Sequence, residues 1–172
     1  MGRAILGAGC FWCVEGAFKQ MRGVESALPA YTGGSVPNPT YNAVCSGNTG
    51  HAETVEVVFD DTIISFETIL EVFFTLHDPT QLNRQGNDIG TQYRSAIFYC
   101  DEGQRMVAEL VKERFSDYFD NDIVTEITPL NNHHIAEKNH HDYFEKNPDN
   151  RYCQMVVAPK LAAIRQKHAA LY

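Results

Sequence analysis

The sequence predicts an α+β protein: a two-layer sandwich with a ferredoxin-like (split βαβ) core and a long irregular C-terminal segment. The first observation is the order of the expected elements, which runs strand, helix, strand, strand, helix, strand, helix, strand. The second is the contrast between segments whose apolar residues alternate and segments whose apolar residues recur every three to four positions. The third is the length, because 172 residues suffice for one domain with a sizeable core. We expect a single domain over 1–172, with 147–172 as a mobile tail.

Strands are predicted where apolar residues form a short run or alternate with polar ones, as Val55, Val57 and Phe59 do. Helices are predicted where apolar residues recur along one face, and Ser65 is a suitable N-cap for one of them. The expected strands are 4–8, 24–31, 54–59, 93–100 and 123–128. The expected helices lie at 14–21, 66–76, 102–119, 136–146 and 160–171.

Two long polar stretches, 35–50 and 81–92, interrupt these elements. Both are rich in Gly, Asn and Pro or Asp, which disfavour regular structure. Polar loops of this length are uncommon inside a compact domain and are often functional. The first loop delivers the chain to Glu53, and the second contains Asp88.

The composition excludes several classes of function. A net charge of −8 argues against binding to nucleic acid, which needs a basic surface. No apolar run approaches the length of a membrane span, and the N-terminus lacks the features of a signal peptide. The five cysteines are an odd number, which disfavours a framework of structural disulfides. We therefore expect a cytoplasmic monomer.

The chemistry is predicted to centre on Cys10, which follows the first strand and precedes the first helix. Unpaired N–H groups and the helix dipole favour an anion at such a place, so we expect the thiol to ionise easily. Gly9 opens the backbone to a ligand. Phe11 and Trp12 cannot both face the core, so at least one of them should line a pocket. The competing interpretation is a buried cysteine that only packs.

Cys10 and Cys13 form a Cys-x-x-Cys pair, which suits a redox disulfide or half of a zinc site. A zinc site needs a second pair of ligands, and the histidine doublets at 133–134 and 140–141 lack the usual spacing, so no metal is expected. Cys45 and Cys100 are expected to be structural. Taken singly, the other polar candidates are unremarkable; they are Glu53, Tyr41, Tyr93 and Asp88.

Several longer motifs give the pattern a meaning. Around Cys10 the chain reads Gly-Cys-Phe-Trp, and further motifs follow at 31–34, 37–41, 45–47, 49–53, 77–79, 85–88, 90–95, 146–148 and 152–153. With these motifs the chain closely resembles peptide methionine sulfoxide reductase A, from about residue 4 to residue 160. The resemblance is weakest at the C-terminal end.

The resemblance implies a thiol mechanism for reducing methionine S-sulfoxide, free and in proteins. Cys10 would attack the sulfoxide sulfur and become a sulfenic acid. Glu53, if buried and neutral, would protonate the departing oxygen. Tyr41 and Tyr93 would hydrogen-bond that oxygen.

The resemblance also assigns the neighbouring side chains. Phe11 and Trp12 would hold the substrate methyl group, and Asp88 would orient the site. Cys153 or Cys13 would resolve the sulfenic acid to a disulfide, with a slight preference for Cys153. Thioredoxin or a similar dithiol would then reduce that disulfide, so no cofactor is expected.

Two alternatives remain open from the residues themselves. One is a thioredoxin-like thiol–disulfide oxidoreductase that uses Cys10 and Cys13. The other is a module whose Phe11 and Trp12 pocket binds methionine-containing peptides without consuming them.

Overall fold

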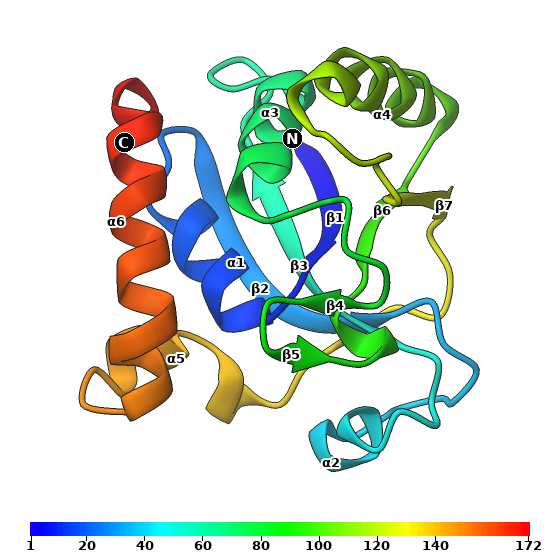
Figure 1. The fold of residues 1–172 in the computed structure, drawn as a ribbon, viewed down its shortest axis with the longest axis vertical. Coiled ribbons are helices and arrows are strands. Elements are labelled where there is room, and N and C mark those ends of the chain that lie inside the picture. The colour runs from blue at the N-terminus through cyan, green and yellow to red at the C-terminus, as the bar shows by residue number, and fades with distance from the viewer.

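A computed structural model describes residues 1–172 and has a central six-stranded sheet with helices packed on one face (Figure 1). A separate two-stranded hairpin lies beside it. The strands of the sheet are β1 (Gly2–Ala8), β2 (Val24–Thr32), β3 (Ala52–Phe59), β6 (Ser95–Tyr99), β7 (Glu126–Pro129) and β8 (His134–Ile135). The hairpin consists of β4 (Arg84–Gln85) and β5 (Asp88–Ile89).

The order of the strands confirms the predicted split βαβ core. The sheet runs β7-β6-β1-β3-β2-β8, and every neighbouring pair is antiparallel except β6 and β7. Strand β3 therefore lies between β1 and β2, and β1 lies between β3 and β6. The register places Tyr31 of β2 opposite Glu53 of β3, and Ala8 of β1 opposite Ser95 of β6. This topology brings the end of β1 together with the starts of β3 and β6 at one end of the strands.

The helices begin where the sequence supplies a capping side chain. Ser65 accepts a hydrogen bond from the Thr68 N–H, and Asp101 accepts one from the Gln104 N–H. The α-helices are α1 (Phe11–Lys19), α2 (Tyr41–Cys45), α3 (Phe66–Leu76), α4 (Glu102–Phe115), α5 (Tyr143–Lys146) and α6 (Ala158–Lys167). Short 3-10 turns cover Thr91–Tyr93, Ser116–Tyr118, Lys138–His140 and Ala169–Leu171, and a π turn covers Cys153–Val157.

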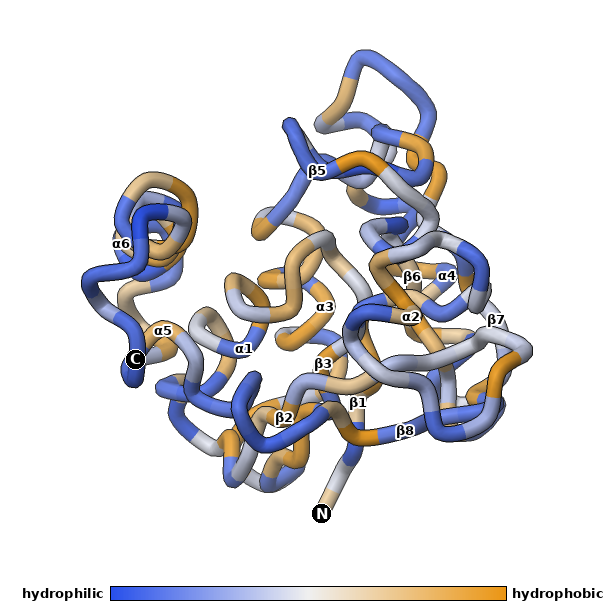
Figure 2. The backbone as a smooth tube through the Cα atoms, turned by 90° about the horizontal axis from the view of Figure 1, so that it is seen from below, coloured by the Kyte–Doolittle hydropathy of each residue, from blue (hydrophilic) through white to orange (hydrophobic).

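The main core lies between the sheet and helices α1 and α3. Phe18 of α1, Phe73 of α3 and Val57 of β3 are fully buried in it. Figure 2 shows the apolar stretches of the chain meeting in this layer, with hydrophilic loops around it. Burying one such large side chain contributes about 2–3 kcal/mol relative to leaving it exposed. A smaller cluster that includes Ile5 and Phe98 covers the other face of the sheet.

The structure corrects three details of the predicted elements. The last predicted strand begins only at Glu126, and both polar loops contain short elements, α2 in the first and the β4–β5 hairpin in the second. The C-terminal segment is irregular only as far as Asn150, because the chain from Arg151 onwards is helical. Val157 and Leu161 are buried there. This packing overrides the preference of the short apolar stretch 152–158 for a strand.

No helix in the structure has both the length and the apolar character needed to cross a membrane.

Candidate active site

Cys10 lies at the junction between the first strand and the first helix, as predicted. Strand β1 ends at Ala8, Gly9 turns the chain with a φ of +90°, and Cys10 is the N-cap of α1. A side chain at Gly9 would meet Gln85, because a Cβ there would lie 2.8 Å from its Cγ. The glycine therefore serves both the turn and the close approach of the β4–β5 hairpin.

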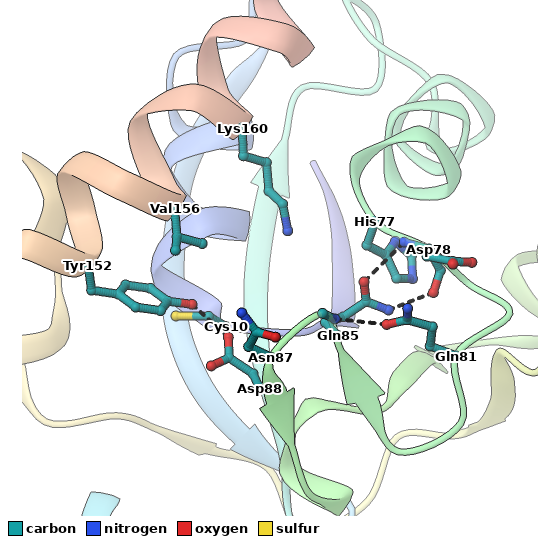
Figure 3. A pocket seen from close by; sticks show the side chains of 11 residues that line it. Cys10, His77, Asp78, Gln81, Gln85, Asn87, Asp88, Tyr152, Val156 and Lys160 are labelled. Carbon is teal, nitrogen blue, oxygen red and sulfur yellow. Dashed lines mark hydrogen bonds between the residues drawn. The ribbon is translucent and has the colours of Figure 1, made fainter.

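A cleft of about 420 Å³ opens in front of Cys10. Asn87 and Asp88 line it from the hairpin, and Tyr152 and Lys160 line it from the C-terminal helical segment (Figure 3). Cys10 itself is 8% exposed. The nucleophile thus lies at the base of an open cleft whose walls come from two segments distant in the sequence.

Tyr152 and Asp88 line the cleft together with Cys10. The Tyr152 hydroxyl donates a hydrogen bond of 2.7 Å to Oδ2 of Asp88, and its ring lies beside the Cys10 side chain (Figure 3). Tyr152, for which the sequence predicted no role, therefore joins Asp88 to the wall of the cleft next to Cys10.

Glu53 lies beside the start of α1 and is 2% exposed. Its Oε1 accepts a hydrogen bond of 3.3 Å from the Phe11 N–H, and its Oε2 is buried without a partner. Burial raises the pKa of this carboxyl well above its ordinary value, and the nearby Cys10 adds to the effect. The acid therefore keeps its proton to a higher pH than an exposed carboxyl does and can donate it there.

Tyr41 and Tyr93 approach the same place from α2 and from the 3-10 turn before β6. The Tyr41 ring stacks against Phe11 with centroids 6.3 Å apart. Burial, together with nearby Cys45 and Glu53, raises the pKa of the Tyr41 hydroxyl, and burial and Glu53 raise that of Tyr93. Both phenols therefore keep their protons and can act as hydrogen-bond donors.

Aromatic rings line the other side of the site. Phe11 is fully buried, whereas Trp12 is half-buried and stacks face to face on Tyr143, with centroids 3.8 Å apart. The indole N–H of Trp12 donates to Nδ1 of His140 at 3.3 Å. Trp12, Tyr41, His140 and Tyr143 border a second cavity, of about 330 Å³. The polar side chains of Asn42, Glu137 and Asn139 complete the lining, so the cavity offers aromatic rings beside hydrogen-bonding groups.

Both proposed resolving cysteines are buried near Cys10. Cys13 lies one helical turn from Cys10, and this neighbouring thiol lowers the pKa of Cys13. Burial raises the pKa of Cys10, so the predicted easy ionisation of Cys10 is wrong for the substrate-free site. Burial and the nearby Cys10 also raise the pKa of Cys153, which begins the π turn. Of the three thiols, the second in the Cys-x-x-Cys pair is the most acidic.

Comparison with known proteins assigns the chain to a family. The sequence profile of the family described as "Peptide methionine sulfoxide reductase" matches residues 2–171. The chain belongs to this family. A peptide methionine sulfoxide reductase MsrA from Natronomonas pharaonis is 54% identical over 168 residues, covering 96% of this chain and 94% of the relative.

Solved structures of methionine sulfoxide reductases share the fold. Methionine sulfoxide reductase A of Corynebacterium diphtheriae superposes with a TM-score of 0.82 at 39% identity, covering 85% of this chain and 74% of that one. Reduced Mxr1 from Saccharomyces cerevisiae gives 0.84 at 32% identity and 88% coverage of both chains. Mxr1 in complex with Trx2 gives 0.60 at 22% identity, covering 83% of this chain and 84% of that one, and shows likeness of fold alone. Membership of this reductase family argues against the two alternative functions, a thioredoxin-like oxidoreductase and a peptide-binding module.

In this reductase the predicted site residues gather around one space, although they come from four separate segments. Two other histidines of the doublets have structural partners. The side chain of His133 bonds to Thr32, and that of His141 bonds to the Ala136 carbonyl. Cys100 is exposed, away from the site. Cys45 is also exposed, and it ends α2, the helix that begins with Tyr41.

Sequence reasoning missed Tyr152, His140 and Lys160 of this reductase. The only signal for Tyr152 is its position directly before Cys153. His140 belongs to the doublet 140–141, whose spacing does not suit a metal site and predicts no other role. The sequence does not distinguish Lys160 from other lysines of a surface helix. Only the fold places its side chain in the cleft.

Proposed function

We propose that the chain reduces methionine S-sulfoxide, free and in proteins, with Cys10 as the nucleophile. The observation that carries the proposal is the juxtaposition of Cys10 with a buried Glu53 of raised pKa in a member of this reductase family. A sulfoxide oxygen leaves only when it is protonated, and Glu53 is a buried acid beside Cys10 that can supply the proton.

In the first step the Cys10 sulfur attacks the sulfoxide sulfur. Glu53 transfers its proton to the oxygen. The oxygen then moves from the methionine sulfur to the Cys10 sulfur as the bond between the two sulfurs breaks, which releases methionine and leaves Cys10 as a sulfenic acid. The thiol proton of Cys10 restores Glu53. Methionine sulfur gains two electrons, and Cys10 loses two.

The phenols of Tyr41 and Tyr93 are proposed to hydrogen-bond the oxygen while its charge develops. Their raised pKa values support this role, because both remain donors at neutral pH. Phe11 and Trp12 are proposed to hold the substrate methyl group, so that one epimer points its oxygen at Glu53. Asp88 is proposed to orient the site through the hydroxyl that it accepts from Tyr152.

Cys13 is proposed to resolve the sulfenic acid, in place of the slight preference for Cys153 drawn from the sequence. Its place one helical turn after Cys10 supports this order, and so does its lowered pKa, because the attacking sulfur is a thiolate. Attack by Cys13 forms a disulfide and releases water. Mapping the disulfides after one equivalent of sulfoxide tests the order: a 10–13 link supports it, and a 10–153 link as the first product contradicts it.

Thioredoxin or a similar dithiol is proposed to reduce the disulfide, without a further cofactor. Mxr1, which is 32% identical to this chain, has been crystallised in complex with Trx2, and this supports the choice. Cys10, Cys13 and Cys153 are all buried, so exchange with a partner requires movement of 147–172, the proposed tail. A cytoplasmic monomer remains our proposal, and the odd number of cysteines supports a reducing location.

The test follows the S epimer by chiral chromatography with a dithiol present. We expect the wild-type chain to consume the S epimer and spare the R epimer. Cys10→Ser should consume neither. Turnover that persists in Cys10→Ser would overturn the proposal.

A further inference from the structure

Lys160 extends from the first turn of α6 into the cleft that contains Cys10 (Figure 3). It takes part in none of the ion pairs of the structure. An unpaired ammonium group at a partly enclosed site exerts a field on its neighbours that solvent screens only in part. Such a group needs a reason to lie there, because lysine side chains ordinarily extend into solvent.

The backbone around Lys160 is fixed against helix α1. The next residue, Leu161, packs on Gly16, where an added Cβ would lie 2.8 Å from its Cδ1. Leu161 and Ile164 are almost completely buried. Gly16 lies three residues after Cys13 on α1, so this contact holds the start of α6 close to the Cys-x-x-Cys pair.

Lys160 lines the cleft together with Cys10, and its charge also acts on Cys13, one helical turn further along α1. The other ionisable groups near Cys13 are Cys10 from the start of the same helix, Asp88 from β5, Tyr152, and Cys153 from the π turn. The positive charge of Lys160 lowers the Cys13 pKa, whereas Asp88 and Cys153 act in the opposite direction. The same ammonium also lowers the pKa of buried His77.

The charged side chains of α1 itself are engaged elsewhere. Glu15 accepts a hydrogen bond from the Asp142 N–H, and Lys19 pairs with Asp142 and Glu145. Both therefore face the segment before α5. The charges that act on Cys13 are therefore those of the groups in and around the cleft.

We propose that Lys160 is a positioning residue for the resolving step, in which it favours the thiolate of Cys13. The inference rests on the proposed function, because it needs a sulfenic acid on Cys10. The Cys13 thiolate supplies the electron pair of the new S–S bond as the S–O bond of Cys10 breaks. The oxygen leaves as water, with the proton it carries and a second from Glu53. Cys13 is oxidised and the sulfenic acid is reduced.

The experiment uses Cys153→Ser as the background, so that only Cys13 can resolve. The reduced protein is mixed with one equivalent of methionine S-sulfoxide and quenched at intervals with dimedone. Mass spectrometry measures the sulfenic acid on Cys10, and chromatography measures released methionine. Lys160→Met removes the charge and keeps the aliphatic stem, Lys160→Arg keeps the charge, and Lys167→Met is the matched control on the same helix.

We expect the sulfenic acid of Lys160→Met to persist about tenfold longer, relative to methionine release, at neutral pH, because the Cys13 thiolate loses the attraction of a nearby cation. The difference should vanish at alkaline pH, where Cys13 ionises without help. Lys160→Arg and Lys167→Met should behave as the background does. This pH dependence and rescue separate an electrostatic role from a structural one.

An unchanged sulfenic acid lifetime in Lys160→Met at neutral pH would overturn the inference. So would a change confined to the sulfoxide concentration that half-saturates methionine release, which would assign Lys160 to binding a substrate carboxylate. Failure of the background itself to release methionine would instead contradict the proposed function. The two failures are therefore distinguishable.

Discussion

The backbone N–H of Phe11 donates a hydrogen bond to Oε1 of Glu53 at 3.3 Å. This contact joins β3, the first strand of the second βαβ unit, to helix α1, at whose start Cys10 lies. The acid is therefore held next to Cys10 by the backbone, and its other oxygen, Oε2, is left without a partner. A bound sulfoxide oxygen would satisfy that buried atom.

Glu53→Gln should slow methionine release in a single turnover by about 10²- to 10⁴-fold, the range of a lost general acid. Glutamine keeps the shape and can still accept the Phe11 N–H, so the fold should persist. Glu56→Gln is the control, because Glu56 lies on the same strand but pairs with Arg3. Release at the wild-type rate from Glu53→Gln would remove the acid from the account.

The pH dependence of the same step should identify the acid. The raised pKa of Glu53 means that the carboxyl keeps its proton to a higher pH than an exposed carboxyl does, and loses it as pH rises further. Wild-type methionine release should therefore fall at alkaline pH. The residual rate of Glu53→Gln should lack this fall, as stopped-flow or quenched-flow measurements across pH would reveal. A fall of equal size in both proteins would assign it to another group.

Removing the hydroxyls of Tyr41 and Tyr93 should slow release in a graded way. Each single change to phenylalanine leaves one donor and should cost about tenfold. The double change should cost about 10²- to 10³-fold, the range expected for the loss of an oxyanion donor. Tyr118→Phe is the control, because this tyrosine is 76% exposed. Additive behaviour of the two single changes would show that the phenols act independently.

Periodicity in the sequence predicted most strands and helices, because burial of one face imposes a repeat on the apolar residues. Val55, Val57 and Phe59 of β3 are an example. The motifs around Cys10 and Glu53 predicted the members of the site through the resemblance that they carry. Tyr152 and Lys160 escaped prediction, since their positions depend on how a C-terminal helix docks on α1. The raised pKa of Cys10 escaped it for a similar reason: burial by distant segments outweighs the helix start.

Glu15 should make stability depend on pH. Burial raises the pKa of its carboxyl from 4.5 to about 7, so the folded state binds the proton more tightly than the unfolded state. This contribution is fully present below pH 4.5 and is lost as pH rises through about 7. Glu15→Gln should remove about 2 kcal/mol of this decline, allowing for partial solvent contact. Glu113→Gln, at an exposed site, should leave the urea-unfolding profile unchanged across pH.

The face-to-face stack between Trp12 and Tyr143 should report on docking of the C-terminal segment. Trp12 is the single tryptophan, so its emission comes from the site alone. Tyr143→Leu should shift that emission to longer wavelength and lower the free energy of unfolding by about 1 kcal/mol through the lost aromatic pair. Tyr118→Leu should change neither. Unaltered emission in Tyr143→Leu would mean that the stack is absent in solution.

The most direct measurement of the central claim uses a chain in which Cys13 and Cys153 are both replaced by serine. After reduction, this protein is given excess methionine S-sulfoxide without any reductant. The account predicts one methionine released per chain, together with one oxygen atom on the peptide that contains Cys10. Adding Cys10→Ser should abolish both. Release from the chain without Cys10, or none from the chain that retains it, would contradict the claim.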